Sequence, residues 1–261
     1  MKNFVVGAQL YSVRTLTQTP ETLESTLKAL KEMGYNTVQL SGQSREIPDE
    51  QVADLLEKYA LKCVVTHNSM DDFDKDLDNL IKRHKTWKCK YAGLGAMPGY
   101  YHENAEAFKN FALHANEIGA KLKDEGLTFV YHNHAFEFQR MDGVLGMDIL
   151  FDNFGDNVQF ELDSFWIQAG GASPYEWFKK VNGRMDVAHF KDMCGTNGFN
   201  PVNIMVPVGS GNINWQAMKQ VCEETGVLYA EVEQDNAANM EDPLGQMKIS
   251  CDNLKKLGFN L

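Results

Sequence analysis

The sequence predicts a protein of the α/β class, a single-domain (β/α)8 TIM barrel that spans residues 1–261. Two observations predict this fold. Short apolar segments alternate with stretches of helical periodicity along the chain, and a length of 261 residues is close to the roughly 250 that such a barrel requires. No linker rich in proline, glycine or serine interrupts the pattern, so we expect one domain.

Eight segments have the composition and length of buried strands, and each precedes a helical stretch. Strands that alternate with helices pair in parallel through right-handed crossovers, and eight such units close into a barrel more readily than they form an open sheet. The predicted strands are Phe4–Gln9, Thr37–Leu40, Leu61–Thr66, Tyr91–Leu94, Leu127–Asn133, Val158–Asp163, Met185–Lys191 and Leu228–Gln234.

The first helix has clear signals at both ends. Thr19 is suited to the N-cap and Pro20 to the first helical position, while Gly34 suits the left-handed conformation that often ends a helix. Between them, apolar residues recur on one helical face, namely Leu23, Leu27, Leu30 and Met33.

Composition narrows the classes of molecule that the protein is expected to bind. The formal net charge is −11 and no basic run is present, which disfavours nucleic acid and anionic membranes and favours a small-molecule substrate. No apolar run approaches the roughly 18 residues that span a bilayer, and the N-terminal residues read as a strand rather than a signal peptide. The five cysteines include no CxxC pair, so we expect reduced thiols and a cytoplasmic protein.

Polar side chains gather where the later predicted strands end. Active sites of such barrels lie at the carboxyl ends of the strands, and side chains two apart on a strand share a face. Imidazoles and carboxylates crowded at one mouth would be poorly compensated without a cation, which predicts one divalent metal ion (Mn, Zn, Co, Fe or Mg). The residues concerned are His67, His132, His134, Glu161, Asp163, His189, Lys191 and Glu233.

Each of these residues taken alone has a simpler interpretation. A single histidine or carboxylate at a strand end is more often a structural or helix-capping group than a ligand, so the prediction rests on four strands supplying such groups together. His67 and Lys191 are equally compatible with structural roles and with substrate contact. Glu231 is expected one layer deeper, as a structural residue. The remaining histidines, namely His84, His102 and His114, are interpreted as surface residues.

Two loops are expected over the same face of the barrel. The longest stretch without periodicity is Cys194–Asn214, and Met97–Glu103 forms a shorter aromatic loop. Within the first loop, Gly209 and Gly211 are only a weak indication of phosphate binding. Asn214 is expected to cap the helix that begins at Trp215.

Six segments, in order, resemble one family. They are GAQLYSVR at the first strand, YHNHAFEF at the fifth, ELDSFW at the sixth, HFKD at the seventh, VGSGNINW before the next helix and EVEQD at the eighth strand. In these segments the chain is similar to the sugar phosphate isomerase/epimerase family, which has a xylose isomerase-like TIM barrel. The resemblance runs from end to end. Barrels of this group often dimerise, so the resemblance is compatible with a homodimer.

The resemblance implies a metal site with one ligand from each of strands five to eight. Asp163, His189 and Glu233 match the family's aspartate, histidine and last glutamate, and His132 stands where many members have the first glutamate. Family epimerases are thought to use both glutamates as an acid–base pair. A histidine at position 132 therefore departs from the two-glutamate mechanism.

The resulting functional hypothesis is a metal-dependent isomerase or epimerase of a sugar or sugar phosphate, which removes a proton next to a carbonyl through a stabilised ene-diolate. Glu233 is the expected base, with His132 or His134 as its partner. His67, Trp166 and Lys191 are expected to bind substrate, with Phe165 helping to cover it. The alternatives are a lyase or hydratase acting on 3-keto-glycosides, and a sugar-binding relative without catalysis.

Overall fold

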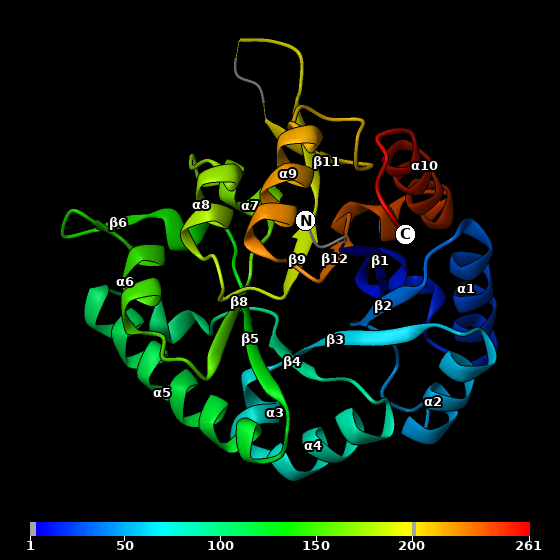
Figure 1. Ribbon diagram of the computed structural model, residues 1–261, viewed down its shortest axis with the longest axis horizontal. Helices are drawn as coiled ribbons and strands as arrows, with labels where there is room; N and C mark the ends of the chain where they lie inside the picture. Colours follow the sequence, from blue (N-terminus) through cyan, green and yellow to red (C-terminus); the bar gives the residue numbers. More distant parts are fainter. Residues whose placement is uncertain (1–3, 200–201) are drawn as a thin grey trace.

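The computed structural model describes residues 4–199 and 202–261 and shows eight strands enclosed by helices (Figure 1). The strands pair in parallel in the order β8-β5-β4-β3-β2-β1-β12-β9. The predicted fold, an α/β barrel in one domain, is therefore confirmed. Its strands are β1 (Val5–Gln9), β2 (Thr37–Leu40), β3 (Lys62–Asn68), β4 (Tyr91–Leu94), β5 (Thr128–His132), β8 (Val158–Glu161), β9 (Val187–Phe190) and β12 (Tyr229–Val232).

The barrel is closed by contacts between its two outermost strands, β8 and β9. The Phe160 amide donates to the Arg184 carbonyl at 2.8 Å, and the His189 amide donates to the Leu162 carbonyl at 2.9 Å. Beyond the end of β8, Asp163 and His189 form a parallel bridge. Two of the predicted metal ligands therefore lie at the seam of the barrel.

Helices form the outer layer, and their apolar faces pack on the strands (Figure 1). Among the described residues, no helix is both long enough and apolar enough to cross a bilayer. The α-helices are α1 (Pro20–Met33), α2 (Asp49–Lys58), α3 (Met70–Lys75), α4 (Leu77–Thr86), α5 (Ala105–Asp124), α6 (Gly146–Asn153), α7 (Ser164–Ala169), α8 (Pro174–Lys180), α9 (Trp215–Thr225) and α10 (Pro243–Lys256). Short 3-10 segments are η1 (Leu10–Leu16), η2 (Gly99–Tyr101), η3 (Phe136–Phe138) and η4 (Asp235–Asn239).

Helix α1 has the predicted ends. The Thr19 hydroxyl accepts a hydrogen bond from the Thr22 amide, and Gly34 closes the helix with a φ of 116°, in the left-handed region. Leu23, Leu27 and Leu30 are buried, so the predicted apolar face is the one that packs on the barrel.

The stretch predicted as one long loop, residues 194–214, contains regular structure. Strands β10 (Asp192–Gly195) and β11 (Asn203–Val206) form an antiparallel hairpin. The glycine-rich turn that follows is organised by a carboxylate of the chain itself, because the Gly209 and Gly211 amides both donate to Oδ2 of Asp192 at 2.9 Å. These amides are therefore already paired, which explains why the glycine pair is a poor phosphate site.

His84 corrects one prediction, because it is fully buried rather than at the surface. Its Nε2 lies 2.8 Å from the Thr66 hydroxyl and its Nδ1 lies 2.8 Å from the Leu80 carbonyl, so it ties α4 to β3. Burial lowers the pKa of His84 to about 4 and keeps the ring neutral. The other two histidines, His102 and His114, are half-buried.

Candidate metal centre

Four predicted ligands meet at the mouth of the barrel. His132 ends β5, Asp163 follows β8 by two residues, His189 lies in β9 and Glu233 directly follows β12. One ligand atom from each lies within 4.8 Å of those of the other three, and all four side chains are buried. Beside them lies a cavity of about 310 Å³, whose lining includes His132 and Glu233. The parallel strands thus deliver two nitrogen and two oxygen donors to one point.

Hydrogen bonds to the outer nitrogens aim both imidazoles at that point. Nδ1 of His132 lies 3.1 Å from the Gly95 carbonyl, which can only accept, so Nδ1 carries the proton and Nε2 keeps its lone pair. Nε2 of His189 lies 2.7 Å from Oε1 of Gln39, and its Nδ1 points toward the other candidate ligands, 3.1 Å from Oε2 of Glu233. Ligand histidines commonly donate their other N–H in this way, because the bond fixes the tautomer and the ring orientation.

The environment sets the protonation state of each candidate ligand. Burial acts to lower the pKa of His189, but the charges of Glu161 and Glu233 raise it well above its usual value, so this ring is protonated here and would release a proton on binding a metal ion. Burial lowers the pKa of His132 to about 4, so its ring is neutral at physiological pH. Burial acts to raise the pKa of Glu233, but the charges of Lys191 and His189 lower it well below its usual value. Burial also acts to raise the pKa of Asp163, but the charge of Lys191, more than any other group, lowers it below its usual value. Both carboxylates are therefore ionised.

The ammonium group of Lys191 already occupies a cation position beside these carboxylates. Its Nζ lies 2.7 Å from Oε2 of Glu233 and 3.1 Å from Oδ2 of Asp163, and the side chain is almost fully buried. Asp235 provides a third carboxylate oxygen 3.2 Å away. Since two ionised carboxylates and two imidazole nitrogens converge on a niche that attracts positive charge, the residues present fit a divalent metal ion.

A buried carboxylate links the predicted substrate residue His67 to the ligand His189. Glu161 is fully buried; its Oε2 lies 2.8 Å from Nε2 of His67 and its Oε1 lies 3.1 Å from Nε2 of His189. Burial acts to raise the pKa of Glu161, but the two histidines lower it.

Sequence reasoning assigned no role to two residues of this site. It placed Glu161 on the same face of its strand as Asp163 without giving it a function, and it did not single out Gln39. A glutamine inside an otherwise apolar strand was a usable signal for Gln39.

The other predicted site residues lie around the same cavity, with one exception. His134 lies just past β5 with its ring 4.9 Å from that of His132 and 5.2 Å from that of Trp166. Burial lowers the pKa of His134 to about 3. Nζ of Lys191 lies 5.3 Å from the Trp166 ring centroid. Phe165, in contrast, is 4% exposed and packs in the core, so the expectation that it covers the substrate is wrong.

Comparison with known proteins supports a relationship along most of the chain. A family model described as the xylose isomerase-like TIM barrel matches residues 27–257. The structure of a sugar phosphate isomerase/epimerase from Parabacteroides distasonis ATCC 8503 superposes with a TM-score of 0.79 and 22% identity, covering 97% of this chain and 98% of that one. The structure of the probable 3-DHS dehydratase from Bacillus anthracis superposes with a TM-score of 0.74 and 14% identity, covering 97% and 99%. At these identities the structures show a common fold.

The sequence of part of this chain is also similar to that of a dehydratase. An inosose dehydratase of Clostridium perfringens is 28% identical over an alignment of 156 positions, which covers 53% of this chain and 52% of that protein. The chain therefore spans about half the length of the curated relatives it matches. The family model covers most of the barrel, including all four converging ligands. We conclude that this chain belongs to the family of xylose isomerase-like TIM barrels.

Proposed function

We propose that this protein is a divalent-metal-dependent enzyme that removes the proton next to the carbonyl of a small sugar, and that the product is an isomer or epimer of the substrate. The observation that carries this proposal is the convergence of His132, Asp163, His189 and Glu233 within 4.8 Å beside a cavity of about 310 Å³. Such a cavity has the size of a small-ligand pocket. The name of the P. distasonis structure, a sugar phosphate isomerase/epimerase, is consistent with this reaction class.

The chain's residues divide the work between charge stabilisation and proton transfer. A divalent ion held by the four ligands would supply a Lewis acid for negative charge that develops on the carbonyl oxygen. Glu233 is ionised and lines the cavity, so it can accept the proton from the neighbouring carbon. Lys191 keeps Glu233 ionised and holds three N–H donors at the same point.

Substrate contacts are assigned to His67, Trp166, Lys191 and His134. His67, His134 and Lys191 line the cavity, and the half-buried ring of Trp166 lies against His134. An aromatic face suits the C–H surface of a sugar, while imidazole and ammonium groups bond its hydroxyls. His134 is the partner we assign to Glu233; its ring is neutral, so it can relay a proton by donating from one ring nitrogen while it accepts a proton at the other.

A second function, dehydration, is favoured by a specific observation. With a histidine at position 132, Glu233 is the single glutamate among the four ligands, whereas an epimerase needs a proton-transfer group on each face of the sugar. A dehydratase needs one base and one acid at the departing hydroxyl, for which the cavity offers Lys191 and His67. The sequence relationship to an inosose dehydratase supports this alternative.

The test begins with elemental analysis of the purified protein, in which we expect a bound divalent metal. Solvent deuterium incorporation into L-ribulose and inosose is then followed by NMR. In Glu233→Gln we expect exchange to fall by about 10²–10⁴-fold, the usual contribution of an acid–base group. Glu241→Gln, which alters an exposed glutamate, is the matched control.

Product mass separates the two reactions, because isomerisation conserves mass and dehydration loses one water. Full exchange by Glu233→Gln with the metal still bound would exclude Glu233 as the base. Sugar binding by the wild type without any exchange would point to the non-catalytic relative instead.

A further inference from the structure

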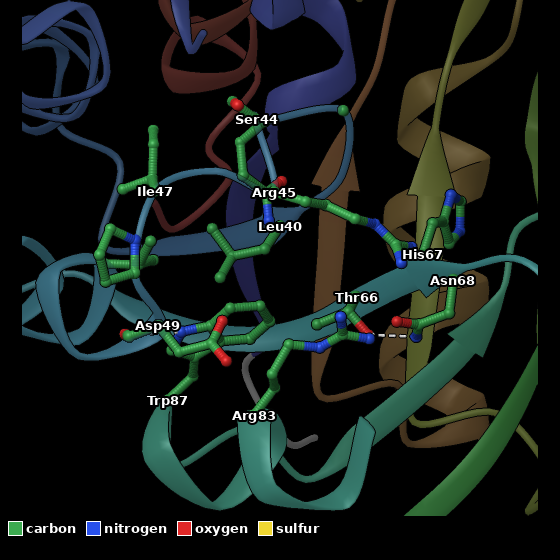
Figure 2. A pocket seen from close by; sticks show the side chains of 14 residues that line it. Leu40, Ser44, Arg45, Ile47, Asp49, Thr66, His67, Asn68, Arg83 and Trp87 are labelled. Carbon is green, nitrogen blue, oxygen red and sulfur yellow. Dashed lines mark hydrogen bonds between the residues drawn. The ribbon is translucent and has the colours of Figure 1, made fainter. Parts of the chain in front are cut away.

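A second cavity, of about 400 Å³, adjoins the metal centre on the outer side of β3 (Figure 2). It lies between the loop after β2, the end of β3 and helices α2 and α4. His67 lines this cavity and also the cavity of the metal centre. The two spaces are therefore neighbours that share one side chain.

Arg83 brings to this second cavity a guanidinium group that lacks hydrogen-bond acceptors. Its side chain is only 14% exposed, and its Nε and Nη2 have no acceptor among the described residues and are shielded from solvent. The part of the side chain that is not shielded lines the cavity. Nη2 lies 3.7 Å from Oδ1 of Asp72, which is too far for a hydrogen bond. A buried charged donor without an acceptor is costly, so this arginine has an unmet requirement for an oxygen partner.

The nearest carboxylate is not available to meet this requirement. Arg45 binds both oxygens of Asp72, at 2.5 and 2.7 Å, and the Ser69 amide and hydroxyl donate to the same carboxylate. Asp49 also lines the cavity; burial raises its pKa, while the positive charge of Arg83 acts to lower it. The charges around the cavity thus nearly balance, and the attraction for an anion comes from the guanidinium group of Arg83, whose charge has no hydrogen-bonded carboxylate among the described residues.

The cavity wall also offers an acceptor. Oε1 of Gln43 is buried without a donor among the described residues. Figure 2 shows the guanidinium of Arg83 reaching from α4 toward Thr66 and Asn68, whose side chains are bonded to each other at 2.8 Å. A ligand that carries an oxyanion can pair with Arg83, since guanidinium pairs well with carboxylate and phosphate oxygens, and a hydroxyl group beside the oxyanion would suit a wall that also includes Gln43.

We propose that this cavity is a subsite for the carboxylate or phosphate group of an acidic sugar, with Arg83 as its principal contact. His67 lines both cavities, so the proposed ligand would place its anionic group at Arg83 and its carbonyl end past His67, near Glu233. This second statement rests on the function proposed above, whereas anion binding at Arg83 does not.

The test titrates the full-length protein, as purified, with inorganic phosphate, D-galacturonate and D-galactose by calorimetry at low ionic strength. We expect one or both anions to saturate a site and D-galactose to bind much more weakly. Arg83→Met should raise the Kd for the anion at least about tenfold, as expected for loss of a charged hydrogen bond. Arg140→Met, at an exposed arginine of strand β6 (Arg140–Met141), should leave the Kd unchanged. Binding of phosphate alone, or of galacturonate alone, identifies the anionic group.

A second variant protects the test against misfolding. Ser44→Trp fills the cavity from a half-buried loop position and should also abolish anion binding, while circular dichroism monitors the fold. The proposal is wrong if neither anion binds the wild type, or if binding persists in both variants. Elemental analysis of the same preparations reports the metal centre separately, so failure of the proposed function and failure of the anion subsite are distinguishable.

Discussion

The two halves of the barrel deliver different chemistry to its mouth. The later strands, β5, β8, β9 and β12, place the ionisable candidate ligands at or just past their carboxyl ends, namely His132, Asp163, His189 and Glu233. The earlier strands β1, β2 and β3 carry buried amides and one histidine, among them Gln9, Gln39 and His67. Both halves have the same architecture, so the difference lies in which side chains end the strands.

This difference shows how a buried cluster of charges is held in place. Ionised carboxylates in the later half need a cation nearby, because burial of unpaired charge is costly. The earlier half contributes groups that orient the ligands without adding charge, as when Gln39 accepts from His189 at 2.7 Å. The later half is therefore expected to determine whether metal binds, and the earlier half how tightly.

The largest effect is expected from Asp163→Asn. Oδ1 of Asp163 caps α7 by accepting from the Trp166 amide at 2.9 Å, and asparagine retains this cap while losing the charge of Oδ2. We expect metal affinity, measured by competition with a chelator, to fall by more than about 100-fold, beyond the range for supporting residues. Asp242→Asn is the control, since Asp242 caps α10 in the same way. Unchanged affinity in Asp163→Asn would remove the distinction between the halves.

A pH-dependent effect is expected from Glu137, which lies beside the later half. It is fully buried, and burial raises its pKa to about 7 from a usual 4.5. Because the folded pKa is the higher one, the stabilisation is complete below about pH 4.5 and is lost as pH rises through about 7, by up to about 3 kcal/mol. Urea unfolding between pH 5 and 8 should show this decline in the wild type and a smaller one in Glu137→Gln. If the free energy of unfolding declined with pH as steeply in Glu137→Gln as in the wild type, Glu137 would not be the group responsible. The control Glu106→Gln, at an exposed glutamate, should leave the decline unchanged.

The smallest effect is expected from the earlier half. Gln39→Met removes the acceptor that fixes the His189 ring, and supporting residues of this kind typically contribute about 10–100-fold in metal affinity. Gln159→Met is a matched control, because Gln159 lies in β8 and pairs with Asp186 rather than with a ligand. If both variants bound metal as tightly as the wild type, Gln39 would have no orienting role.

The pattern of apolar residues predicted where the eight barrel strands lie, but it predicted their first and last residues less accurately. β2 and β4 have the predicted bounds, whereas β5, β8, β9 and β12 are shorter than predicted. The reason is that an apolar pattern reports burial rather than strand pairing. Leu162 and Asp163 remain fully buried past the end of β8, so the pattern continues where the ladder has stopped.

The convergence of the candidate ligands was predictable from the sequence, and their supporting contacts were less so. Alternation of faces along each strand was enough to suggest that Asp163, His189 and Glu233 face one axis. The bond between Gln39 and His189, in contrast, joins residues 150 positions apart, and no local pattern specifies such a partner. Arg83 lies on α4, where an arginine would ordinarily be solvated, and only packing against the second cavity gives it a role.

Two of the candidate ligands lie where β8 meets β9, so a metal ion bound there would connect the two edges of the sheet. The two edges of an otherwise continuous sheet meet at Asp163 and His189, where the barrel has its shortest run of strand pairing. An ion bound to both side chains would hold the two edges together, because it would bind the closed barrel and not a barrel opened along that line. Any separation of β8 from β9 would then depend on whether the protein carries a metal ion.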